Sequence, residues 1–440
     1  MTSNGYTEAY VWIWLPAETQ PVVAGRLFAE GEVLLFNYGK SYLERDNAMP
    51  IHEPELPLQA GMIPLLPGLS LPNCIRDGAP DAWGRRVIIN RKLSRQGKNV
   101  TDNQLDELTY LLESGSDRIG ALDFQRSPSE YVPRSPTNAS LDELLEAAER
   151  VEKGIPLTAE LDQALHYGSS IGGARPKALV EDHKKKFIAK FSSSSDLHSV
   201  VKGEFVAMRL AHIVGLSVAP VTLKKTASKD VLLIERFDRV LSAQGWQRKS
   251  MVSALTLFEL DEMMARYASY EDLAEIVRHR FSDAPASLRE LFGRMTFNIL
   301  SGNTDDHARN HAAFWDGEIL TLTPAYDICP QGRSGNEASQ AMLISGDNRM
   351  SRISACLEAA HLFQLSIEEA VAIIEKQMIG IGENWAKVCQ AAELSDADGN
   401  LFWGRQFLNP FAFEDLADET IHLRDLADEL RQKFRSGNRP

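Results

Sequence analysis

The segment "NILSGNTDDHARNHAAF" at residues 298–314 carries carboxylates and amides at a spacing suited to phosphate chemistry. Asp305 and Asn310 are five positions apart. In the catalytic loop of protein kinases the same spacing separates an Asp that takes the substrate hydroxyl proton from an Asn that binds magnesium. Asp327 follows in "PAYDICP", after an expected strand, where a kinase-like fold needs a second magnesium carboxylate. We therefore expect Asp305 to act as a base and Asn310 and Asp327 to hold Mg²⁺, which prefers oxygen ligands.

A second group of residues lies upstream, in the Gly-rich stretch "GSSIGGARPK" at 168–177. Glycines let a backbone approach a ligand closely and direct several N–H groups at one anion. The N–H groups of Ile171, Gly172 and Gly173 are the candidates to hold nucleotide phosphates. Lys190, eighteen residues after Gly172 in the expected strand "FIAKF", is placed to reach the same phosphates.

The stretch "IERFDR" at 234–239 ends another expected strand. The main-chain groups of Glu235 and Phe237 could bind adenine there. Each motif also has an interpretation without function: a surface turn at 168–177, an acidic turn at Asp305–Asp306, a helix cap at Asp327, a solvated strand edge at Lys190 and a surface charge run at 235–238. The order of the motifs along the chain favours nucleotide binding, because a Gly-rich loop, a strand lysine, a hinge, the Asp–Asn pair and a strand-linked Asp follow one another.

A Walker P-loop and a zinc-binding helix are each excluded by one residue of the sequence. A Walker P-loop that starts at Gly168 requires a lysine after Gly173, but the chain has Ala174. His307 and His311 have the spacing of a zinc-binding helix, but the HExxH motif requires Glu where the chain has Ala308.

The elements expected to position these residues change character along the chain. The runs "YVWIWLP" and "EVLLFNY" predict strands near the N-terminus, and 80–93 and 103–113 predict helices, the second capped by Thr101 or Asp102. "SLDELLEAAERVEKG" predicts a capped helix that ends at Gly154, and "KALVED" and "KKKFIAKFSS" predict two strands. From about residue 245 the sequence is helical, interrupted by an expected hairpin at Asp316–Gly317. We therefore expect an N-terminal subdomain at 1–125, a linker at 126–140, a small nucleotide-binding lobe at 141–245 and a helical catalytic lobe at 246–440.

Composition limits the class of protein. The 440 residues carry a formal net charge of −14, which argues against broad nucleic-acid binding by the whole surface. The four cysteines are far apart and form no CxxC pair, as expected in a reducing compartment. No apolar run approaches the length of a membrane span. We expect a cytoplasmic protein without a membrane partner.

Taken together, the motifs resemble those of the HipA family of serine/threonine kinases, the toxins of bacterial toxin–antitoxin pairs. The resemblance rests on "SSIGGARPKALV", "ERFDR", "NTDDHARN" and "PAYDI", and on "DGAPDAWGRRVI" (77–88) and "GSDRIGALDF" (115–124) in the N-terminal part. The fold it implies is α+β: a two-lobe, protein-kinase-like fold with a β-rich N-terminal subdomain and an all-helical C-terminal lobe. The chain departs from the protein-kinase pattern in having Thr304 before Asp305 and Ile328 after Asp327.

The same resemblance implies ATP and Mg²⁺ as cofactors and autophosphorylation at Ser170, or at its neighbour Ser169. It also implies a HipB-like helix-turn-helix antitoxin as partner, contact with operator DNA only through that antitoxin, and an aminoacyl-tRNA synthetase or other translation protein as substrate. Two alternatives stay open at this point. A small-molecule phosphotransferase would use the same base and metal ligands, and a catalytically silent co-repressor would use none of them.

Overall fold

The computed structural model describes residues 5–96, 105–134, 139–166, 170–193, 196, 198–226, 229–333, 335 and 337–435. It divides into two compact units. Unit 1 comprises residues 1–195, 224–252 and 314–318, and unit 2 comprises residues 196–223, 253–313 and 319–440.

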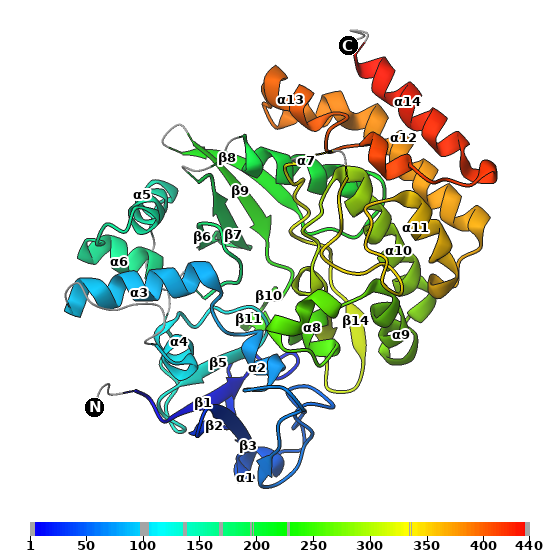
Figure 1. The fold of residues 1–440 in the computed structure, drawn as a ribbon. Helices are drawn as coiled ribbons and strands as arrows, with labels where there is room; N and C mark the ends of the chain where they lie inside the picture. Colours follow the sequence, from blue (N-terminus) through cyan, green and yellow to red (C-terminus); the bar gives the residue numbers. More distant parts are fainter. Residues whose placement is uncertain are drawn as a thin grey trace. The chain divides into compact units, whose positions relative to one another are not determined.

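Unit 1 begins with a five-stranded antiparallel sheet whose order is β4-β3-β2-β1-β5 (Figure 1). Its strands are β1 (Glu8–Ile13), β2 (Val22–Glu30), β3 (Val33–Tyr38), β4 (Met62–Ile63) and β5 (Leu122–Gln125). The two predicted N-terminal strands are β1 and β3. Strand β2, which pairs with both of them, was not predicted. The chain between β3 and β5 forms α1 (Lys40–Leu43), α2 (Asn73–Arg76), α3 (Ala82–Gln96) and α4 (Glu107–Glu113). The observed cap of α4 is Asp106, whereas Thr101 and Asp102 lie outside the described residues.

The second sheet has the order β6-β7-β9-β8, and it carries the Gly-rich segment and the candidate lysine. Its strands are β6 (Lys177–Glu181), β7 (Lys186–Phe191), β8 (Val221–Thr226) and β9 (Lys229–Glu235). Helices α3, α5 (Leu141–Glu152) and α6 (Ala159–His166) lie beside this sheet (Figure 1). Their side chains share a buried apolar cluster with β6, β7 and β9. The prediction of a capped helix before the sheet is confirmed, because Ser140 and Glu143 form a capping box at the start of α5. The next strands are β10 (Arg239–Ser242), β11 (Gly245–Arg248) and β12 (Met251–Ser253).

Unit 2 is mainly helical, as predicted. Four of its helices are α7 (Val200–Ile213), α9 (Tyr270–Arg280), α10 (Ala284–Ser301) and α12 (Ile367–Ala391). Helices α7 and α10 pack against α12, and α9 packs against α10 (Figure 1). The other helical elements are α8 (Ala254–Leu257), η2 (Glu262–Tyr267), η3 (Ala308–Asn310), α11 (Ile353–Glu358), η4 (Ala360–Phe363), α13 (Asp396–Phe402), η5 (Pro410–Phe413), η6 (Asp418–Thr420) and α14 (His422–Arg435). The expected hairpin is formed by β13 (Ala312–Trp315) and β14 (Leu320–Leu322).

Within the described part of the chain, no helix combines the length and the apolar character that a membrane crossing requires.

Candidate active site

The loop that carries Asp305 starts where helix α10 stops. Gly302 closes the helix with φ 72°, in the left-handed region that favours glycine. A Cβ atom on this residue would lie 2.7 Å from the Gln406 carbonyl oxygen. The loop is then fixed by backbone bonds from Gln331 N–H to the Gly302 carbonyl (2.9 Å) and from Ala341 N–H to the Thr304 carbonyl (3.0 Å).

Substitution of Gly302 by alanine should therefore disturb the start of this loop. We expect a loss of at least about 1–2 kcal/mol in the free energy of unfolding, the cost of left-handed backbone for an L-residue, with the steric overlap against Gln406 adding to it. Urea unfolding of the full chain measures the effect. Gly399→Ala in α13 is the matched control, since nothing lies within 4 Å of its added Cβ atom. An unchanged urea midpoint for Gly302→Ala would contradict the geometry.

Asp305 is exposed at the tip of the loop, and its surroundings raise its pKa. Desolvation by the neighbouring protein is the largest cause, and the charges of Asp327 and Asp306 add to it, while His307 opposes them. Asp305 and Asp327 are therefore close enough to repel each other although they come from different segments. The fold brings together the two carboxylates that the sequence motifs singled out.

Beneath Asp305 lies a buried polar network that supports the loop. The Asp306 carboxylate accepts a hydrogen bond from the Tyr270 hydroxyl, and its Oδ2 atom lies 3.0 Å from Nε2 of His311. Burial alone would raise the pKa of Asp306, but His311 and Tyr270 hold it below its ordinary value. The acidic-turn interpretation thus fails for Asp306, which is almost fully buried. Tyr270 was missed by the sequence analysis because it lies 36 residues away at the start of α9.

Asn310 and Asp327 lie on either side of the β13–β14 hairpin. The Nδ2 atom of Asn310 donates to the Asp305 carbonyl at 3.2 Å, so its amide oxygen faces away from that carbonyl. Asp327 has φ 59°, a left-handed conformation that is uncommon for a residue other than glycine and is concentrated at functional sites. The neighbouring Tyr326 hydroxyl donates to the Arg309 carbonyl at 2.7 Å, which ties the Asp327 segment to the loop.

The zinc-helix alternative does not match the geometry of this loop. The chain between His307 and His311 is the 3₁₀ turn η3 and not an α-helix, and His311 is bonded to Asp306. Among the residues that the structure describes, no three His, Cys, Asp or Glu side chains are grouped as a metal site would require.

The Gly-rich segment and Lys190 lie in unit 1. Ser169 is outside the described residues, and Ser170 and Ile171 are buried. Lys190 is buried on β7, an interior strand, which excludes the solvated-edge interpretation. It pairs in register with Lys177 of β6, so two buried lysines stand opposite each other on the same face of the sheet. The Nζ atom of Lys177 donates to the Gly172 carbonyl at 2.5 Å. Lys177 was not among the predicted site residues.

The expected hinge is the end of β9, where Glu235 pairs in register with Phe187. The Glu235 carboxylate forms an ion pair with Lys185 at 2.6 Å. The Phe237 ring lies edge-on to Phe314, with 5.9 Å between ring centroids. Strand pairing holds Glu235 in place, and aromatic packing holds Phe237. The main-chain groups of these two residues are the candidates for binding adenine.

The charged side chains of Arg236, Asp238 and Arg239, next to the expected hinge, are buried. The interpretation of this stretch as a surface charge run is therefore wrong for Arg236 and Asp238. Arg236 and Arg239 share the carboxylates of Asp117 and Asp238 at distances from 2.7 to 3.1 Å. Burial would raise the pKa of both carboxyls, but the guanidinium groups hold it below the ordinary value. Asp238 also accepts a hydrogen bond from Gly120 N–H at 2.8 Å. This network fastens the motif "GSDRIGALDF" to the end of β9.

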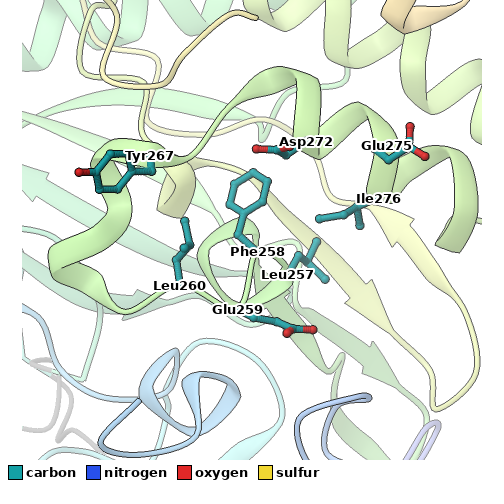
Figure 2. Close-up of a pocket in the computed structure, with 8 residues that line it drawn as sticks. All are labelled: Leu257, Phe258, Glu259, Leu260, Tyr267, Asp272, Glu275 and Ile276. Carbon is teal, nitrogen blue, oxygen red and sulfur yellow. The ribbon is translucent and has the colours of Figure 1, made fainter. Parts of the chain in front are cut away.

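A surface pocket of about 510 Å³ in unit 2 lies beside the start of α9 (Figure 2). It is lined by Leu257, Phe258, Glu259, Leu260, Tyr267, Asp272, Glu275 and Ile276. None of the candidate residues lines it, and its lining includes no basic side chain that would neutralise phosphates. We do not assign the nucleotide to this pocket.

The two-unit chain has the fold class of a protein kinase, with a sheet that carries the Gly-rich segment in one unit and a helical unit that carries the base and metal-ligand candidates. The sequence profile of the HipA-like C-terminal domain matches residues 169–388, and that of the HipA N-terminal domain matches residues 15–125. The chain belongs to the HipA family of protein kinases.

Individual relatives agree with this assignment. The chain is 27% identical over 183 residues to the serine/threonine-protein kinase toxin HipA of Shewanella oneidensis, covering 36% of this chain and 42% of that protein. It is 25% identical over 316 residues to a candidate kinase, Y4mE, of Sinorhizobium fredii, covering 67% and 71%. A solved complex of Shewanella oneidensis HipA, HipB and operator DNA contains a chain of the same fold, with a TM-score of 0.65, 17% identity and coverage of 96% of this chain and 99% of that chain.

Proposed function

We propose that the protein is an ATP- and Mg²⁺-dependent serine/threonine kinase that acts as the toxin of a toxin–antitoxin pair. The observation that carries this proposal is the loop of unit 2, in which exposed Asp305 is tied to Asn310 and lies within electrostatic range of Asp327. A proton acceptor beside two oxygen ligands is the set that phosphoryl transfer to a hydroxyl requires.

In this proposal Asp305 accepts the proton of a substrate Ser or Thr hydroxyl. The hydroxyl oxygen forms a bond to the γ-phosphorus of ATP, the bond from that phosphorus to the bridging oxygen breaks, and ADP leaves with the electron pair. The raised pKa of Asp305 makes it a better proton acceptor than a fully hydrated carboxylate. The buried Asp306–Tyr270–His311 network would keep Asp305 in position without touching the substrate.

Magnesium would be held by the Asp327 carboxylate and the amide oxygen of Asn310. Both are hard oxygen donors, and magnesium usually takes only one or two protein ligands beside phosphates and waters, so a pair fits the metal. The repulsion that Asp305 feels from Asp327 is a further reason for a cation here. When bound, the metal would neutralise charge on the β- and γ-phosphates.

The residues of unit 1 would bind the nucleotide. We assign Lys190 to the phosphates, together with the N–H groups of the segment Ile171–Gly173, and the main chain of Glu235 and Phe237 to adenine. Support comes from the burial of Lys190 on the interior strand β7 and from the position of Glu235 at the end of β9. The lysine ammonium is a compact positive charge that binds phosphate oxygens well.

The partner and substrate proposals rest on the family. We propose a HipB-like helix-turn-helix antitoxin, because the solved relative is a complex with HipB and operator DNA. The net charge of −14 fits contact with DNA through that partner and not by this chain alone. The proposed substrate is an aminoacyl-tRNA synthetase or another translation protein, and the four free cysteines agree with a cytoplasmic location.

Ser170 is the proposed autophosphorylation site, with Ser169 as the neighbouring alternative. Ser170→Ala should abolish the modification and keep ATP binding. Ser170→Asp should bind ATP more weakly, because Ser170 is buried in the loop that would hold the phosphates, and phosphoserine there would carry about −1.5 to −2 charge. Calorimetric titration with ATP and phosphopeptide mapping measure the two effects. Equal ATP affinity of phosphorylated and unmodified protein would contradict the weakening of ATP binding by a charge at Ser170. A phosphate on Ser169 would move the modification site by one residue.

A further inference from the structure

The Gly-rich segment of unit 1 is hydrogen-bonded to Asp81 and Trp83, which belong to the motif "DGAPDAWGRRVI". The Gly173 backbone N–H donates to Oδ2 of Asp81 at 2.6 Å. The Trp83 backbone N–H donates to the Gly173 carbonyl at 3.2 Å, and its indole N–H donates to the Lys177 carbonyl at 2.9 Å. Both main-chain polar groups of Gly173 are therefore bonded to a segment about 90 residues earlier in the chain.

The Asp81 carboxylate also packs directly against the neighbouring glycine. A Cβ atom on Gly172 would lie 2.7 Å from Asp81 Oδ2, so only a residue without a side chain fits beside the carboxylate in this arrangement. The Gly172 carbonyl accepts the hydrogen bond from Lys177 Nζ on the other side. The segment is thus held between a carboxylate and an ammonium group.

In this held arrangement Ser170 is hidden. The residue is 2% exposed, and its hydroxyl oxygen has no hydrogen-bond partner in the part of the chain that the structure describes. A buried hydroxyl without a partner carries a desolvation cost. Phosphate cannot be transferred to an oxygen that ATP cannot reach, so modification of Ser170 requires the segment to move away from Asp81.

We propose that Asp81 is a positioning residue that latches the Gly-rich segment with Ser170 buried, and that release of this latch controls phosphorylation of Ser170. The proposal rests on the proposed function for the modification itself, whereas the latch is a property of the loop alone. The Asp81 carboxylate and a phosphate group are both anions that accept hydrogen bonds from backbone N–H groups. A phosphate bound at Gly173 N–H would have to displace Asp81.

Hydrogen–deuterium exchange of the full chain tests the latch without any catalysis. In Asp81→Ala the amides of the peptide that covers residues 170–175 should exchange at least about tenfold faster, the factor expected for losing a hydrogen bond to a charged group. Asp81→Asn keeps an acceptor oxygen and should fall between wild type and Asp81→Ala. Asp46→Ala, which removes an exposed carboxylate from the same unit, should match wild type. Equal exchange of this peptide in wild type and Asp81→Ala would overturn the proposal.

Gly172→Ala provides a second way to release the latch, because the added methyl group collides with Asp81 and leaves the carboxylate itself unchanged. It should also speed exchange of the 170–175 peptide. If Asp81→Ala fails to fold, the Gly172→Ala result decides the question, and unchanged exchange in that variant would equally contradict the latch.

Phosphopeptide mapping after incubation with Mg·ATP measures the rate of Ser170 phosphorylation. This rate distinguishes release of the latch from general damage to the fold. Asp81→Ala should gain phosphate on Ser170 faster than wild type, whereas a merely structural defect would slow it. Faster exchange with slower or equal phosphorylation of Ser170 would contradict the control of modification by Asp81. If no variant, wild type included, gains phosphate on Ser170, the proposed autophosphorylation fails and with it the regulatory part, while the exchange data still decide the latch.

Discussion

Asp305→Asn should bind ATP as well as the unaltered protein and transfer its γ-phosphate about 10²–10⁴-fold more slowly, the usual contribution of a general base. The amide cannot accept the hydroxyl proton, but it occupies the same volume at an exposed position of the loop. Calorimetric titration with ATP measures binding, and the initial rate of phosphate incorporation measures transfer. The two measurements together separate a catalytic role from a binding role.

Asp347→Asn is the matched control for this substitution, since Asp347 is an exposed carboxylate of the same unit that lies outside the loop. It should leave both quantities unchanged. If Asp305→Asn transferred phosphate at the rate of the control, Asp305 would not be the base. If it lost ATP binding instead, Asp305 would belong to the nucleotide-binding residues.

Asp238→Asn should lower the free energy of unfolding by about 3–5 kcal/mol, the usual cost of removing one partner from a buried ion pair. Asp238 is almost fully buried between Arg236 and Arg239, and the substitution would leave those two guanidinium groups with Asp117 as the carboxylate they share. Urea unfolding measures the loss. Asp46→Asn, on an exposed turn of the same unit, should change stability by less than about 0.5 kcal/mol.

The same network predicts a pH dependence. The folded-state pKa values of Asp117 and Asp238 lie below the ordinary 3.8, so their contribution to stability is complete above that pH and is lost as the pH falls through the folded values. Asp238→Asn should therefore lose less stability than the unaltered chain between about pH 4 and pH 2. If the free energy of unfolding fell equally with pH in both proteins, the ionised Asp238 carboxylate would not contribute to stability as described.

Motif spacing was informative where residues close in sequence act together. Asp305 and Asn310 could be paired because one loop holds them, and the Ser140–Glu143 capping box could be predicted because its bonds are local. The strand lysine Lys190 was located correctly on an expected strand, because the run "KKKFIAKF" combines apolar and aromatic residues in the manner of a strand.

Contacts between distant segments could not be predicted in this way. The bonds of Asp81 with Gly173 and of Tyr270 with Asp306 join residues 92 and 36 positions apart, and no spacing rule relates them. Strand β2 was missed because Gly25 and Arg26 interrupt the apolar pattern of "VVAGRLFAE". Gly25 is nevertheless required there, since a Cβ atom would lie 2.2 Å from the Asn37 carbonyl oxygen on β3.

Phosphate transfer to a protein hydroxyl is the central claim, and one labelling experiment tests it most directly. Bacterial lysate is incubated with ATP labelled at the γ-phosphate, Mg²⁺ and either the purified chain or its Asp305→Asn variant, and the labelled products are separated by size and identified by mass spectrometry. We expect label on serine or threonine of a protein with the unaltered chain and a loss of that label with the variant. Label recovered only in small molecules, or protein labelling that is equal for both chains, would contradict the account.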